Sequence, residues 1–200
     1  LELGHRVLIQ AAKLAKEDTI VVTDVGQHQM WTAQYYPIEK PRTFCTSGGL
    51  GTMGYGLGAA IGAAKATGKH VILVTGDGCF NMNLNELSTA VTHELPITIL
   101  LMNNHALGMV RQWQKLFYGN RFSQTDVRKR TDYVKFAESF GAVGLAIEKE
   151  EDIVPVLTKA LATQTPVLVD CRISNDENVL PMIKPGQTYD TIITDWEARE

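Results

Sequence analysis

Short apolar segments separated by helix-length stretches constrain the fold of this chain more than any other feature of its sequence. Four such segments are rich in branched apolar residues, and they span residues 19–23, 71–75, 97–102 and 167–171. Each has the length of a strand and is apolar on both faces, as in a parallel sheet covered by helices on each side. The alternation predicts an α/β fold: a doubly wound, mostly parallel sheet with helices on both faces.

Apolar residues recur at helical spacing between the predicted strands. An amphipathic stretch covers residues 5–16, and similar spacing marks residues 84–95 and 133–140. Asn83 and Glu86 have the spacing of a capping box, with Asn in place of the usual Ser or Thr. We therefore expect a helix to begin at residue 84, after the second of the four strands.

Composition and charge exclude several classes of protein. The 200 residues suffice for one full-sized domain or two small ones, and 19 Lys and Arg against 22 Asp and Glu leave a net charge of −3. So small an imbalance gives no electrostatic reason to expect nucleic acid or a membrane surface as a partner. No apolar run approaches the roughly 20 residues that a membrane helix needs. Three cysteines without a CxxC pair argue against a disulfide framework or a zinc site, and predict a reduced, cytoplasmic protein.

The two ends of the chain bear on its domain organisation. The sequence opens at Leu1 without an initiating Met or a signal segment, so we expect a piece of a longer polypeptide cut at a domain boundary. Residues 1–172 are predicted to form one α/β domain. Acidic residues and prolines gather after it, and residues 173–200 are predicted to run as a C-terminal arm over the surface.

Polar or Gly-rich residues follow three of the predicted strands, at 24–29, 76–79 and 103–106. Ligands of such sheets bind at the carboxyl ends of the strands, where Asp77 and Asn104 would meet. One carboxylate and one amide oxygen suit Mg²⁺ or Ca²⁺. Two side chains are too few for a complete cage, whereas Mg²⁺ is typically shared with substrate phosphates and water. The pair therefore predicts a magnesium site with a phosphate-bearing ligand.

Glycines crowd residues 47–58 and allow two interpretations. Gly49, Gly51 and Gly54 form a GxGxxG pattern, but residues 41–46 before it are not the buried apolar strand that a dinucleotide fingerprint requires. The match is therefore weak support for NAD. Gly58 and the glycine four residues later are instead expected to give a helix a smooth face for close packing. The loop at 48–51 is expected to let main chain approach a ligand.

The combination of Gly76-Asp77-Gly78 with Asn103-Asn104, in a strand–helix–strand context, resembles the motif of thiamine diphosphate (ThDP)-dependent enzymes. Five further segments resemble acetolactate synthase (acetohydroxyacid synthase) catalytic subunits: residues 25–31, 47–56, 108–113, 117–118 and 179–183. The resemblance covers nearly the whole chain. It corresponds to the C-terminal, diphosphate-binding domain of that family.

The resemblance assigns roles to individual residues. Asp77, Asn104 and the backbone carbonyl of Ala106 would bind Mg²⁺. Gln27 and His28 would contact the diphosphate. Met53 would hold the cofactor in its bent conformation. The residues implied to contact the cofactor are Gln27, His28, Gly51, Thr52, Met53, Gly76, Asp77, Gly78, Cys79, Asn104, Ala106, Leu107, Gly108 and Met109.

Trp113 and Met109 fall where the family forms the pocket for the second substrate. An equally weighted alternative is that Met109, Trp113 and Leu116 form the core stripe of a helix. Cys79 is expected to be a small buried thiol without a redox role. Gly58 departs from the family, which more often has proline at that position.

The resemblance also implies parts that this chain lacks. No catalytic residue is assigned here, because the family's essential glutamate comes from the N-terminal domain of a partner subunit. The central domain that binds FAD is missing as well. We therefore predict that this chain alone makes no acetolactate.

The function implied by the resemblance is ThDP-dependent decarboxylation of pyruvate and carboligation to pyruvate or 2-ketobutyrate. The products would be 2-acetolactate or 2-aceto-2-hydroxybutyrate, in branched-chain amino-acid biosynthesis. A homodimer or homotetramer is expected, with a regulatory small subunit as a further partner. Two alternatives stay open: another pyruvate-using ThDP enzyme, such as a pyruvate oxidase or a 2-keto-acid decarboxylase, or a non-catalytic module that binds a phosphorylated ligand.

Overall fold

A six-stranded, all-parallel sheet forms the centre of the molecule, in the order β2-β1-β3-β4-β6-β5. The computed structural model describes residues 1–127 and 131–194. The sheet confirms the predicted doubly wound α/β fold. Its strands are β1 (Ile20–Thr23), β2 (Phe44–Thr46), β3 (Val71–Gly76), β4 (Ile97–Asn103), β5 (Val143–Ile147) and β6 (Val167–Arg172).

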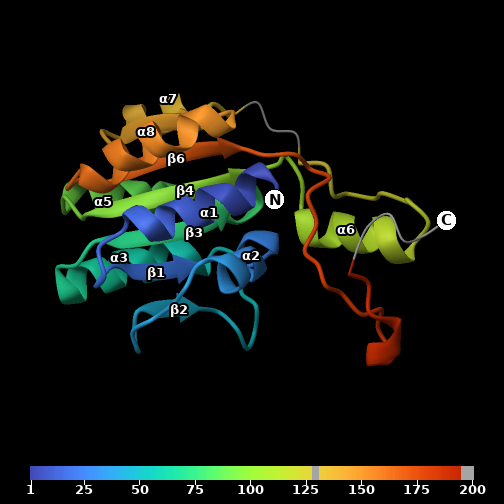
Figure 1. Cartoon of the computed structure of the whole chain (residues 1–200). Helices are drawn as coiled ribbons and strands as arrows, with labels where there is room; N and C mark the ends of the chain where they lie inside the picture. Colours follow the sequence, from blue (N-terminus) through green and yellow to red (C-terminus); the bar gives the residue numbers. More distant parts are fainter. Residues whose placement is uncertain (128–130, 195–200) are drawn as a thin grey trace.

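Helices cover both faces of the sheet (Figure 1). Helices α1, α2 and α8 pack on one face, and α3, α4, α5 and α7 pack on the other, so the sheet separates two apolar cores. Helix α6 lies beyond the carboxyl edge of the sheet, beside the chain that follows β6. The helices are α1 (Leu3–Leu14), α2 (Gln27–Tyr35), α3 (Tyr55–Thr67), α4 (Asp77–Asn83), α5 (Leu87–Thr92), α6 (Gly108–Phe117), α7 (Tyr133–Ser139) and α8 (Glu150–Ala162), with the 3-10 turns η1 (Leu84–Glu86) and η2 (Tyr189–Thr191).

The register of the central strands aligns the ends that carry polar residues. Strands β3 and β4 pair directly, and Gly76 at the end of β3 lies opposite Met102 near the end of β4. Asp77 follows β3 immediately, and Asn104 follows β4 immediately. The pairing therefore delivers both residues to the same edge of the sheet.

The two strands that the sequence did not predict lie at the two edges of the sheet. Strand β2 is only three residues long, and all three are half-buried. Strand β5 is also half-buried along most of its length. Edge strands are partly exposed, so their sequences lack the continuous apolar runs that reveal central strands.

The expected helix start at residue 84 is wrong. Helix α4 begins at Asp77, directly after β3, and is followed by η1 and the short helix α5. Asn83 makes no capping hydrogen bond with its side chain. Its Nδ2 donates instead to the carbonyl of Gly54 at 2.6 Å, because α4 packs against the start of α3. The capping-box prediction therefore fails on a tertiary contact.

Close packing along α3 involves a different glycine from those expected. A Cβ atom on Gly58 or Gly62 would meet nothing within 4 Å among the described residues, so these two glycines form no tight contact there. Gly56 is the crowded position. A Cβ on it would lie 2.8 Å from both Leu73 Cδ1 and Asp24 Oδ2.

The chain after β6 passes α2 and α6 before it reaches η2. Ile173, Glu177 and Val179 are buried in this stretch, whereas residues 183–192 are mostly exposed. A short antiparallel bridge joins Met182 to Ile193. The domain boundary at residue 172 stays a prediction.

No helix within residues 1–127 and 131–194 is both long and apolar enough to cross a membrane.

Replacement of Gly56 by alanine should destabilise the fold, because the new methyl group would force Leu73 or Asp24 to move. We expect a loss of about 1–3 kcal/mol in the free energy of unfolding, measured with denaturant. Gly58→Ala is the matched control on the same helix. It should be neutral or stabilising by up to about 1 kcal/mol, because alanine is the better helix former at an open site. Equal effects of the two substitutions would contradict this packing.

Candidate functional site

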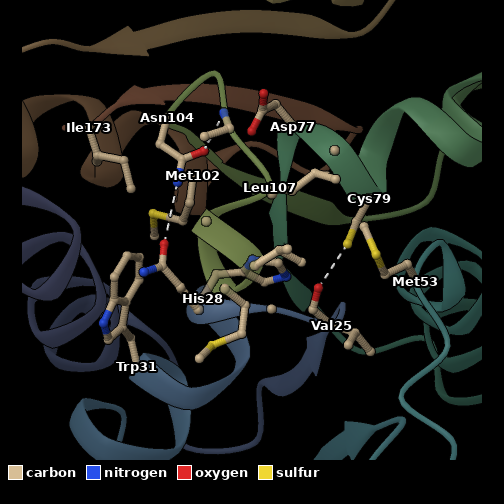
Figure 2. Close-up of a pocket in the computed structure, with 18 residues that line it drawn as sticks. Val25, His28, Trp31, Met53, Asp77, Cys79, Met102, Asn104, Leu107 and Ile173 are labelled. Atoms are coloured by element: carbon tan, nitrogen blue, oxygen red, sulfur yellow. Dashed lines mark hydrogen bonds between the residues drawn. The ribbon is translucent and has the colours of Figure 1, made fainter. Parts of the chain in front are cut away.

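A pocket opens at the carboxyl ends of β1, β3 and β4 (Figure 2). It is lined by all the residues that the resemblance assigned to the cofactor except Gly51 and Thr52. These two lie exposed in the loop before α3. The sheet thus gathers the assigned residues from four separate stretches of sequence around one cavity.

Asp77 and Asn104 face this pocket together. Both side chains are buried, and both residues line the same cavity. Burial raises the pKa of Asp77 to about 6, against the opposing effects of backbone N–H groups and of His105. A buried carboxylate whose pKa is raised in this way is stabilised by a nearby cation, which restores its charged form.

The donor set suits a cation that is shared with a ligand. Within the described residues, no group of three or more His, Cys, Asp or Glu side chains could hold a metal. The expected set has one carboxylate, one amide and one main-chain carbonyl, which is typical of Mg²⁺ completed by phosphate and water. The bridge between Ala106 and Asp126 uses the carbonyls of His105 and Thr125, and it leaves the Ala106 carbonyl outside the bridge.

His28 presents an unsatisfied polar atom in the same pocket. Its ring is buried, and Nε2 has no hydrogen-bond partner among the described residues. Burial lowers the pKa of His28 to about 4, although the carboxylate and backbone of Asp24 oppose this shift. In the tautomer that protonates Nε2, this nitrogen can donate to a phosphate oxygen, and the backbone N–H groups at the start of α2 favour anions as well.

The side chain of Gln27 is hydrogen-bonded within the protein. Its Nε2 donates to Gln112 Oε1 and to the carbonyl of Glu177, each at 2.9 Å. Its Oε1 accepts from Asn104 Nδ2 at 3.4 Å. Because both amide hydrogens are engaged within the protein, a contact between Gln27 and a diphosphate would have to come from its main-chain N–H.

Asp24 organises the Gly-rich loop, a role that was not predicted although residues 24–29 were noted as polar residues after a strand. Its buried carboxylate accepts hydrogen bonds from the backbone N–H groups of Val25 at 2.9 Å, Gly54 at 2.9 Å and Gly56 at 3.1 Å. These bonds fix the loop beside β1 and place Met53 at the pocket wall near Cys79 (Figure 2). An acidic residue directly after a buried β-branched strand was the signal that could have revealed it.

Two glycines of the pocket lie at closely packed positions. A Cβ on Gly78 would lie 2.8 Å from Leu107 Cδ2, and one on Gly108 would overlap with Gln27 Oε1. Cys79 is the buried thiol that the sequence predicted. Its Sγ donates to the carbonyl of Val25 at 3.0 Å, and burial raises its pKa to about 12.

Helix α6 separates the two residues assigned to the substrate pocket. Met109 lines the cavity and packs against one core, whereas Trp113 is 38% exposed and lies outside the pocket. Trp113 contacts Phe117 edge to face, with ring centroids 5.6 Å apart. The alternative of a core stripe is therefore wrong for Trp113. The buried residue of this helix is Gln112.

The parallel sheet, the polar strand ends and the Gly-rich loop are the features of a domain that binds a phosphorylated ligand at the carboxyl edge of its sheet. The sequence pattern of the C-terminal TPP-binding domain of thiamine pyrophosphate enzymes matches residues 24–171. The chain belongs to this family.

Within this family, curated relatives of the chain include acetolactate synthases. The chain is 46% identical over 192 residues to an acetolactate synthase of Mycobacterium bovis, covering 93% of this chain and 31% of the relative. It is 44% identical over 191 residues to the mitochondrial acetolactate synthase catalytic subunit of Saccharomyces cerevisiae, covering 94% and 28%. It is 45% identical over 174 residues to the acetolactate synthase isozyme 3 large subunit of Escherichia coli, covering 85% and 30%. The chain thus spans about a third of the length of these relatives, and the expected similarity to acetolactate synthases is confirmed.

A solved structure supports the fold. The chain resembles benzoylformate decarboxylase from Polynucleobacter necessarius with a TM-score of 0.78, over 88% of this chain and 34% of that one. At 22% sequence identity, this similarity bears on the fold alone.

In an NMR titration, the ring signals of His28 should stay nearly unchanged between pH 8 and pH 5, because its pKa of about 4 lies below this interval. Because the folded pKa of about 4 lies below the usual histidine pKa of 6.5, the unfolded chain binds more protons in this interval. The contribution of His28 to stability is therefore lost as pH falls from 6.5 toward 4, by on the order of 3 kcal/mol.

The comparison that isolates this effect is between the wild type and His28→Gln, with exposed His93→Gln as the control. The difference in unfolding free energy between wild type and His28→Gln should shrink as the pH falls. A titration of His28 near pH 6.5 would show that the ring is not buried as described.

Proposed function

We propose that this chain is the ThDP- and Mg²⁺-binding part of an acetolactate synthase. The observation that carries the proposal is the meeting of Asp77 and Asn104 in one pocket, together with the unpaired His28 nitrogen. Identities near 45% to acetolactate synthases favour this activity over others of the ThDP family.

Different residues of the pocket would bind different parts of the cofactor. Asp77, Asn104 and the carbonyl of Ala106 would bind Mg²⁺. The start of α2 and His28 would bind the diphosphate, and Met53 would contact the organic part. When bound, thiamine diphosphate supplies an electron sink for the decarboxylation of a 2-keto acid and the transfer of the remaining two-carbon unit.

The substrates of the proposed reaction are pyruvate and a second 2-keto acid, pyruvate or 2-ketobutyrate. Met109 at the pocket wall and Trp113 on the exposed side of α6 would shape the position of the second substrate. For Trp113 this requires a surface from outside the chain to complete the pocket. This is consistent with an active site assembled from several domains.

The remaining expectations rest on the relatives and on the sequence. We propose that the catalytic glutamate and FAD are supplied by other domains. We also propose that the enzyme is a homodimer or homotetramer, that it associates with a regulatory small subunit, and that it resides in the cytoplasm. The E. coli relative is itself described as a large subunit.

Product analysis of the full-length protein tests the proposed function. With ThDP, Mg²⁺, FAD and pyruvate, we expect 2-acetolactate as the main product. Addition of 2-ketobutyrate should also yield 2-aceto-2-hydroxybutyrate. The 200-residue chain alone should produce neither. Acetyl phosphate or free aldehyde as the main product would instead support a pyruvate oxidase or a decarboxylase, and the absence of any turnover would support a binding module.

A further inference from the structure

Buried carboxamides connect the cation-binding residue Asn104 to the chain after β6. We propose that Gln112 and Gln27 are positioning residues that orient the Asn104 amide, so that its oxygen rather than its nitrogen faces the cation. The inference rests on the proposed function, because it concerns the Mg²⁺ of that same site. It assigns a role to Gln112, which lies outside the pocket lining.

The first step of the connection fixes the orientation of Gln112. Its Oε1 accepts from the backbone N–H of Val179 at 2.8 Å, and its Nε2 donates to the Val179 carbonyl at 2.8 Å. A backbone N–H can only donate and a carbonyl can only accept, so the two ends of the Gln112 amide cannot be exchanged. Gln112 is only 2% exposed, so water does not compete for these bonds.

The second step transfers this orientation to Gln27. Gln112 Oε1 also accepts from Gln27 Nε2, and the other hydrogen of that amino group goes to the Glu177 carbonyl. Two acceptors, Gln112 Oε1 and the Glu177 carbonyl, therefore hold the Gln27 nitrogen toward α6 and the chain after β6. Its Oε1 must point the opposite way, toward Asn104.

The third step orients Asn104 itself. Gln27 Oε1 accepts from Asn104 Nδ2 at 3.4 Å, and the N–H of Ala106 donates to the Asn104 oxygen at 3.0 Å, so the two contacts together orient the amide. Figure 2 shows this oxygen on the side of the pocket where Asp77 lies. An amide turned the other way would direct hydrogens at the cation and repel it.

Loss of Gln112 would release Gln27 and so weaken the orientation of Asn104, whose oxygen would still accept from the Ala106 N–H. Without Gln112 Oε1, the amino group of Gln27 keeps only the Glu177 carbonyl as acceptor, and rotation of Gln27 could then offer hydrogens to Asn104. Outer partners that orient a metal ligand typically change metal affinity by about 10–100-fold when they are removed. The same size of effect is expected here.

Metal binding by the full-length protein provides the test. Mn²⁺ can replace Mg²⁺, and its free concentration can be followed by electron paramagnetic resonance in the presence of ThDP. Gln112→Met should weaken Mn²⁺ binding at least about tenfold. Gln34→Met is the matched control, because Gln34 also donates to the chain after β6, at the Leu180 carbonyl, without connecting to Asn104. It should bind Mn²⁺ within about twofold of the wild type.

A second pair of variants, made in the Asn104→Asp protein, distinguishes a positioning role of Gln112 from a role in general stability. In Asn104→Asp, an oxygen faces the cation whichever way the side chain is turned. Gln112→Met should therefore cost less than about threefold in this background, and the released Gln27 amide could even donate to the new carboxylate. A purely structural role of Gln112 would cost the same factor in both backgrounds.

Each result has one meaning for the inference. Wild-type Mn²⁺ affinity in Gln112→Met, or an equal loss in both backgrounds, overturns the role of Gln112 and leaves the proposed function intact. Failure of the wild-type protein to bind Mn²⁺ with ThDP overturns both. The inference is supported if Gln112→Met weakens Mn²⁺ binding in the protein that keeps Asn104 but not in the Asn104→Asp variant.

Discussion

The direct pairing of β3 and β4 brings Asp77 and Asn104 to the same edge of the sheet, and the rest of the site depends on this placement. Two neighbouring parallel strands end at the same level, so each places one oxygen-bearing side chain in a common pocket. Burial raises the pKa of Asp77 to about 6, which means that the isolated domain holds this carboxylate in an unfavourable environment. A divalent cation shared with a diphosphate would relieve that cost.

Other parts of the structure keep this pair in place. The Asp24 carboxylate fixes the Gly-rich loop at Gly54 and Gly56, and the missing Cβ of Gly56 lets α3 approach the sheet. On the opposite side, buried carboxamides hold Asn104 against α6 and the chain after β6. Gln27, Cys79 and Asn104 are thus held by hydrogen bonds to distant parts of the sequence.

The sequence predicted what depends on local patterns. Central strands carry continuous apolar runs, and polar residues directly after them mark the edge of the sheet where Asp77 and Asn104 meet. The edge strands β2 and β5 were missed because half-exposed strands lack this pattern. The capping role of Asn83 was wrong because the side chain bonds to Gly54, twenty-nine positions away. Interactions of this kind, including those of Asp24 and Gln112, follow only from the folded arrangement.

Calorimetric titration of the full-length protein with ThDP and Mg²⁺ tests the central claim most directly. The account predicts a clear binding heat for the wild type and its loss in Asp77→Ala, while a variant at an exposed acid, Asp18→Ala, should bind as the wild type does. Equal heats and affinities for the wild type and Asp77→Ala would show that this carboxylate does not hold the cation, and would contradict the account.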